Sequence, residues 1–103
     1  EDVDLEKWID STSQLELRHA EELVCIRFSK EAAIYIRERQ WHKNQVISEL
    51  KNGSIEISFP TRSLEEVKRW VLGYGSSALV LEPAPLRKMV KDDLLQAAKN
   101  YTK

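Results

Sequence analysis

Apolar residues recur along the chain with two different periods, and the changes of period mark out the expected elements. Residues 23–28 are rich in β-branched and aromatic side chains, which predicts a strand. The inner face of this strand is expected to carry Val24, Ile26 and Phe28. Ser29 then offers an N-cap hydroxyl, and residues 30–39 predict a helix. The side chains that this helix is expected to bury are Ala32, Ala33, Ile36 and Tyr35.

The pair Asn52-Gly53 lies between two further runs typical of strands, residues 45–51 and 54–60. Asn-Gly supplies the two positive φ values of a type I′ turn, so we expect a hairpin closed by a two-residue turn. The register of that hairpin would set Leu50 opposite Ile55, Ser48 opposite Ile57 and Val46 opposite Phe59. These pairs would form one mostly apolar face. The side chains expected on the opposite face are Glu49, Glu56 and Ser58.

A second helix is expected after the hairpin. Ser63 and Glu66 have the spacing of a capping box, and Gly73 and Gly75 offer ways to end the helix. The apolar residues that recur at helical spacing between these signals are Leu64, Val67, Trp70, Val71 and Tyr74. The amphipathic pattern therefore predicts a helix that packs one face on the sheet.

The chain is expected to end with a short strand and a long helix, and to begin with a short helix. Residues 78–82 form an apolar run that Pro83 stops, and Pro85 suits the first turn of a helix. The apolar face of this last helix comprises Leu86, Met89, Val90, Leu94, Ala97 and Tyr101. Residues 4–11 also have helical spacing. Their apolar face comprises Leu5, Trp8 and Ile9.

The predicted order is β-α-β-β-α-β with a further helix at each end, which is an α+β chain. Two helices on one face of a four-stranded antiparallel sheet in this order give a ferredoxin-like arrangement, with the first and third strands in the centre. We divide the chain into a linker segment, residues 1–21, and a folded domain, residues 22–103. Enzymes, RNA binders and sensors share this fold, so the fold alone does not identify a function.

Composition excludes several kinds of site. The 103 residues include one cysteine and two histidines, which rules out an internal disulfide and a four-ligand zinc site made from these residue types. No glycine-rich phosphate loop or nucleophile motif is present, so we expect no catalytic residue, no metal and no cofactor. No apolar run is long enough to cross a membrane. A free cysteine and the absence of a signal peptide favour the cytoplasm, and the abrupt start at Glu1 suggests a piece of a longer protein.

Charge is distributed unevenly along the chain. Residues 1–22, which we call the acidic segment, carry eight acidic and two basic side chains, a net charge of −6, whereas the remainder carries +5. The acidic segment is either a linker from another domain or a plainly solvated surface, and both interpretations stay open here. The remainder is not basic enough for a protein that binds duplex DNA strongly, since such domains usually have a pI above about 9.

One group of residues has the chemistry of a ligand site. Arg37, Arg39, Trp41 and His42 combine cations, an indole and an imidazole where the first helix meets the hairpin. Single-stranded nucleic acid or another anion would bind such a group through charge and stacking. Equally, cations stabilise the C-terminus of a helix, and Trp41 would then close the core. Stacking of RNA bases on the strands is rejected, because Phe28 and Phe59 are in phase with the expected core.

Several stretches together resemble the C-terminal extension, or WCX domain, of bacterial WYL-domain transcriptional regulators. The resemblance covers nearly the whole chain. The matching stretches are residues 37–45, Asn52-Gly53 with Ile57-Ser58-Phe59, residues 70–75, Val80-Leu81-Glu82-Pro83 with Leu86-Arg87, and Tyr101, and residues 3–8 are similar to the linker that follows a WYL domain. The turn departs from the family in having Asn52 where Asp is common.

The resemblance implies a regulator with an N-terminal winged helix-turn-helix, a central WYL domain and this chain as the last part. It implies that operator DNA is bound only through the missing N-terminal domain. We expect a non-catalytic module that forms a homodimer and relays the state of an effector. Its interface would use Leu5, Trp8, Ile9, Leu86, Met89 and Val90. The alternative is a module that itself helps to bind a single-stranded oligonucleotide or another anionic effector, through Arg37, Arg39, Trp41 and His42.

Overall fold

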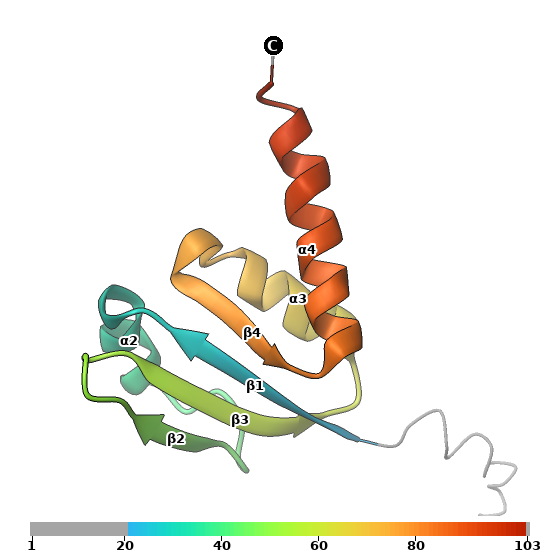
Figure 1. The fold of residues 1–103 in the computed structure, drawn as a ribbon. Coiled ribbons are helices and arrows are strands. Elements are labelled where there is room, and N and C mark those ends of the chain that lie inside the picture. Colours follow the sequence, from blue (N-terminus) through green and yellow to red (C-terminus); the bar gives the residue numbers. More distant parts are fainter. Residues whose placement is uncertain (1–20, 103) are drawn as a thin grey trace, which may run out of the picture.

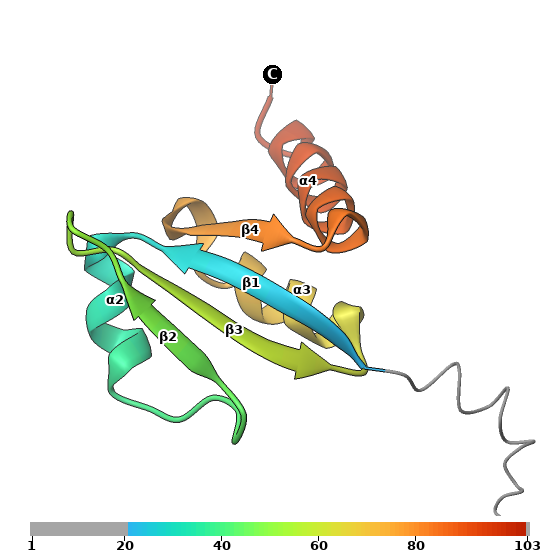
Figure 2. The same ribbon diagram turned by 60° about the horizontal axis from the view of Figure 1, so that its bottom comes forward.

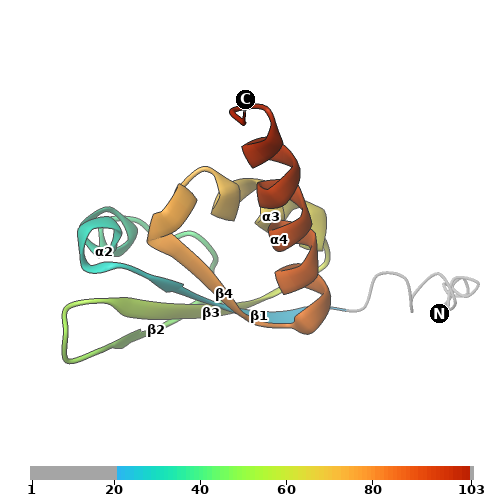
Figure 3. The same ribbon diagram turned by 45° about the horizontal axis from the view of Figure 1, so that its top comes forward.

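The computed structural model describes residues 21–102, which form a four-stranded antiparallel sheet with helices packed on one face (Figures 1 and 3). The elements are, in order, β1 (Glu22–Phe28), α2 (Lys30–Arg37), β2 (Val46–Glu49), β3 (Ile55–Thr61), α3 (Leu64–Leu72), the 3₁₀ turn η1 (Gly75–Ser77), β4 (Ala78–Glu82) and α4 (Ala84–Lys99). The α+β class is therefore confirmed. The helix predicted over residues 4–11 lies outside the described residues.

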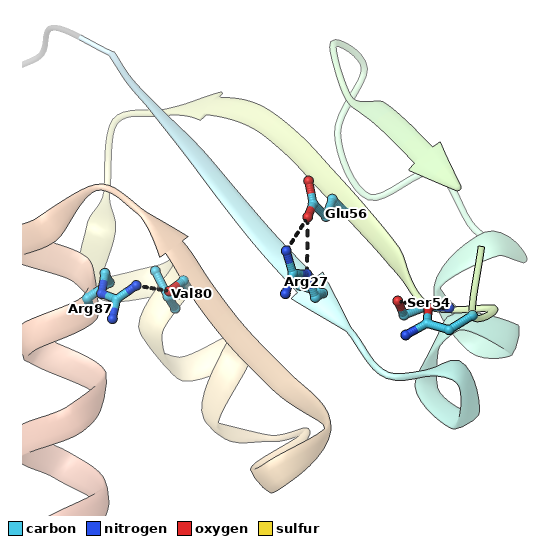
Figure 4. Close-up of polar contacts among 6 residues, drawn as sticks. Arg27, Ser54, Glu56, Val80 and Arg87 are labelled. Carbon is cyan, nitrogen blue, oxygen red and sulfur yellow. Dashed lines mark hydrogen bonds and ion pairs between the residues drawn. The ribbon is translucent and has the colours of Figure 1, made fainter. Parts of the chain in front are cut away.

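The order of strands in the sheet is β2-β3-β1-β4, which Figure 2 shows from a second direction. The first and third strands lie in the centre, as predicted, and the order is compatible with a ferredoxin-like fold. Val24, Ile26 and Phe28 of β1 are fully buried against the helices. On the open face of the sheet, Arg27 donates two hydrogen bonds to the Glu56 carboxylate of β3 (Figure 4). The alternation predicted for β1 thus separates a core face from a polar face.

The predicted hairpin is present, but its predicted register was wrong by one residue. Ile47 pairs with Ile57 and Val46 with Ser58, because the loop contains three residues rather than two. The Gly53 amide donates to the Leu50 carbonyl, and Gly53 has a φ of +91°. A turn followed by one residue at positive φ closes a three-residue hairpin loop.

The one-residue shift exchanges the two faces of β2. Ile47 packs against the core, while Val46 lies on the open face and is 63% exposed. Glu49 now pairs with Ile55 and so shares the face that carries the helices, opposite to the prediction. Glu56 and Ser58 do lie on the open face, as predicted, since they pair with Arg27 and Cys25 of β1.

Both predicted caps on the helices packed against the sheet are present. The Ser29 hydroxyl accepts from the Ala32 amide, and the Ser63 hydroxyl accepts from the Glu66 amide at 3.2 Å. Tyr35 was predicted to be buried but is 63% exposed, because it lies about 100° around α2 from Ile36. The narrow stripe that α2 buries consists of Ala32, Ala33 and Ile36.

Helix α4 leaves the edge of the sheet directly after β4 and packs against β4 and α3 (Figure 1). Leu86 and Val90, in its first half, are buried, whereas Leu94 and Leu95 are largely exposed. The apolar face predicted for this helix therefore continues beyond the part that the domain covers, up to the exposed Tyr101. No helix within residues 21–102 has the length and apolar character needed to cross a membrane.

Candidate functional site

The C-terminus of α2 carries the residues for which the sequence predicts a ligand site. The first of these cations, Arg37, forms an ion pair within the domain. Arg37 donates to both carboxylate oxygens of Glu49, at 3.0 and 2.8 Å, and also to the Gly53 carbonyl. These hydrogen bonds lower the pKa of the Glu49 carboxyl and raise the pKa of the Arg37 guanidinium. Arg37 therefore ties α2 to both ends of the hairpin loop.

Trp41 closes the core at this junction. Its indole Nε1 donates to the Ile36 carbonyl at 2.9 Å, which satisfies an orphan acceptor of the helix end. Its ring lies 5.2 Å from the Trp70 ring of α3. The Gln45 side chain accepts from the backbone amides of Trp41 and His42, at 2.7 and 3.0 Å, and so fixes the connection. The guanidinium of Arg39 lies 4.8 Å from the centroid of Trp41, in cation–π geometry.

His42 stacks on Phe59 with ring centroids 5.3 Å apart and planes 15° apart. Its Nδ1 accepts from the Asn44 amide at 2.9 Å. The Trp70 ring contacts further aromatic rings on both sides, with its centroid 5.9 Å from that of Phe59 and 5.3 Å from that of Phe28. We call these rings the aromatic cluster, which consists of Phe28, Trp41, His42, Phe59, Trp70 and Tyr74.

A shallow hollow of about 250 Å³ opens over the outer side of the aromatic cluster. Its lining consists of Trp41, His42, Phe59, Thr61, Glu66, Val67 and Trp70. Of the four predicted ligand residues, Trp41 and His42 line this hollow, Arg39 lies over the Trp41 ring, and Arg37 is paired with Glu49 instead. Phe59 and Trp70 were predicted only as core residues. The periodicity of a strand or helix does not show that they also line a surface hollow.

A larger groove, of about 670 Å³, lies between β4 and α4, and we call it the β4–α4 groove. Its apolar lining includes Leu79, Leu94 and Leu95, and its charged lining comprises Arg87, Lys88, Lys91 and Asp92. Arg87 reaches across to donate to the Val80 carbonyl at 3.3 Å (Figure 4). Lys88 pairs with Asp92 at 2.7 Å, one turn along α4.

Of the α4 residues predicted for an interface, Val90 lines the β4–α4 groove, whereas Leu86 and Met89 do not. Leu86 and Val90 belong to the domain's own core and Met89 is half-buried, while the apolar residues that α4 exposes are Leu94 and Leu95. Leu5, Trp8 and Ile9 lie outside the described residues. Strict alternation along β4 could have placed Leu79 on the outer face, since Val80 faces the core. An interface role stays a prediction for all six residues proposed from the sequence, which are Leu5, Trp8, Ile9, Leu86, Met89 and Val90.

Residues 21–102 contain no group of three or more histidine, cysteine, aspartate or glutamate side chains that could hold a metal ion.

Two comparisons bear on the family. No match to the chain is found among curated proteins. The family model of the WCX domain matches residues 20–98, which cover both candidate surfaces and every described element except the last residue of α4. The chain belongs to the WCX domain family.

Proposed function

We propose that this chain is a non-catalytic C-terminal module of a WYL-type, helix-turn-helix transcriptional regulator of the cytoplasm. In that role it forms a homodimer and relays the state of an effector to the DNA-binding domain. The WCX family match over residues 20–98 supports the regulatory context. Operator DNA would be contacted by the helix-turn-helix domain of the longer regulator and not by this chain.

The observation that carries the dimerisation proposal is the β4–α4 groove. Both walls of the groove carry exposed leucines, Leu79 on β4 and Leu94 with Leu95 on α4. Apolar side chains gathered in one open groove are typical of a contact surface, whereas scattered single ones are not. The long last helix gives the groove a rigid wall that projects from the sheet (Figure 1).

Sedimentation of the chain over a wide range of concentration tests this proposal. We expect a reversible monomer–dimer equilibrium that Leu95→Glu weakens by at least about tenfold, since a buried charge at an interface is costly. Ile34→Glu is the matched control, because Ile34 on α2 is 55% exposed and Leu95 is 56% exposed. A chain that stays monomeric at every concentration, or equal effects of the two variants, would contradict the role of this groove in dimerisation.

A second candidate function rests on the hollow over the aromatic cluster. Trp41 and His42 line this hollow beside an apolar floor, and the Arg39 guanidinium lies in cation–π geometry with Trp41, a combination suited to a single-stranded oligonucleotide or another anionic effector. Fluorescence anisotropy with a labelled short oligonucleotide at two salt concentrations tests it. Arg39→Ala should weaken a salt-sensitive interaction, and Lys99→Ala, which removes one charge at the far end of α4, should not.

A further inference from the structure

The β4–α4 groove combines apolar and cationic side chains. Leu79, Leu94 and Leu95 are between 44% and 56% exposed in the described structure, so each would gain from being covered. The cations that line the groove are Arg87, Lys88 and Lys91, against the single lining carboxylate of Asp92. A ligand complementary to this surface is a short amphipathic segment with leucine-sized apolar residues and an excess of acidic ones.

The acidic segment of this same chain has that composition. Leu5, Trp8 and Ile9 recur at the i, i+3 and i+4 spacing that places apolar side chains on one face of a helix. Acidic residues surround them, since residues 1–22 carry a net charge of −6. An isolated helical turn of this length is marginal in water, so such a segment needs a surface to bind.

The connectivity brings this segment to the groove. Cys25 of β1 pairs with Glu82 at the end of β4, two residues before α4 begins at Ala84. Glu22 is the first residue of β1 and lies about 10 Å along the strand from Cys25. Helix α4 has 16 residues and is about 24 Å long. The ten residues between positions 11 and 21 can span up to about 33 Å when extended, which is more than the length of α4.

We propose that the β4–α4 groove is the binding site of the acidic segment of this chain, supplied in cis or by a second copy. Leu5, Trp8 and Ile9 cover the exposed leucines, and the neighbouring carboxylates lie beside the cations of α4. The proposed contact is made by side chains, and the Val80 carbonyl of β4 already accepts a hydrogen bond from Arg87. The proposal rests on the proposed function only in treating the groove as a contact surface.

Backbone amide NMR shifts of the full chain provide the first test. Replacing Leu5, Trp8 and Ile9 together by serine should shift the amides of Leu79, Leu94 and Leu95 and leave those of α2 unchanged. Leu15→Ser is the control, because it removes an apolar side chain of the same segment outside the 5-8-9 face. Raising the salt concentration should produce part of the same shifts, since the contact is partly electrostatic. Shift changes confined to residues 1–20 would overturn the proposal.

Cross-linking separates this proposal from the dimerisation proposal. In a Cys25→Ser background, Ile9→Cys with Leu95→Cys should form a disulfide at least about tenfold faster than Ile9→Cys with Ile34→Cys, because binding raises the effective concentration of the two thiols. The mass of the product shows whether one chain or two are joined, and both results support the contact. Equal rates overturn the proposal, even for a chain that sedimentation shows to be a dimer. A fast cross-link within a strict monomer would instead contradict dimerisation alone.

Discussion

The α2–β2 junction and the β4–α4 groove use their side chains in opposite ways. At the junction, chemically versatile residues are engaged within the domain: Arg37 is held by Glu49, and Trp41 donates to the Ile36 carbonyl and packs against Trp70. In the groove, ordinary leucines of β4 and α4 remain largely exposed. Residue types that suggest a binding site, such as arginine and tryptophan, thus partly serve to stabilise the fold itself.

The partners of a side chain within the domain therefore decide its availability for a ligand more than its chemical type does. An arginine held by a bidentate carboxylate has few donors left for a ligand. A leucine that is about half exposed can still gain about 25 cal/mol for each Å² of apolar surface that a partner covers. Substitutions at the junction should therefore mainly change stability, and those in the groove should mainly change association.

The largest expected effect is at the centre of the aromatic cluster. Trp70→Ala removes a ring that lies within 6.1 Å of the Phe28, Trp41, Phe59 and Tyr74 rings. We expect a loss of about 3–5 kcal/mol in the free energy of unfolding, measured by urea denaturation. Leu95→Ala in the groove should change it by less than about 0.5 kcal/mol. Similar losses for both variants would remove the distinction between the two regions.

Local signals predicted most of the fold. The N-cap serines Ser29 and Ser63, the two-residue alternation of β1 and the proline after β4 all act within a few residues, so they can be read directly from the chain. The order of elements then restricts the sheet to very few topologies, and the central position of β1 and β3 follows.

The errors concern quantities that local patterns do not determine. The register of the hairpin depends on whether the turn has one or two residues at positive φ, and Asn-Gly is compatible with both loops. Glu49 was therefore placed on the wrong face, and its ion pair with Arg37 was missed. The period of a helix also does not show how far its apolar face is covered, which changes along α4 from the buried Leu86 to Leu94 at 44% exposure.

The second largest effect is expected at the turn that fixes this register. Gly53→Ala places a side chain at a φ of +91°, where its Cβ would also lie 3.0 Å from the Lys30 side chain. Because the lysine can move, the backbone conformation dominates, and we expect a loss of about 1–2 kcal/mol in urea unfolding. Lys51→Ala in the same loop is the control and should be nearly neutral. An unchanged Gly53→Ala protein would contradict this loop geometry.

A smaller effect sharpens the assignment of Trp41 to the fold. Trp41→Phe keeps an aromatic ring in the core but removes the hydrogen bond from Nε1 to the Ile36 carbonyl. The expected loss is about 1 kcal/mol in the free energy of unfolding, the usual value of one such bond. Arg39→Ala, which removes only the cation stacked above the ring, should stay within about 0.5 kcal/mol. A larger effect from Arg39→Ala would show that the exposed cation, and not the indole, holds the junction together.

The smallest effect is expected for the ion pair of Arg37 and Glu49, because both groups are exposed to solvent and screened. The folded pKa of Glu49 is lowered, chiefly by the hydrogen bonds from Arg37, from the ordinary value of 4.5. The stabilisation is therefore present above pH 4.5 and is lost as the pH falls through the lowered folded pKa. Thermal unfolding of Arg37→Gln should show a slightly reduced Tm at neutral pH, and the difference from the wild type should vanish in acid. Lys43→Gln removes the same charge from the adjacent loop. If it reproduces the same pH dependence, the effect belongs to net charge and not to the pair that fixes the hairpin on α2.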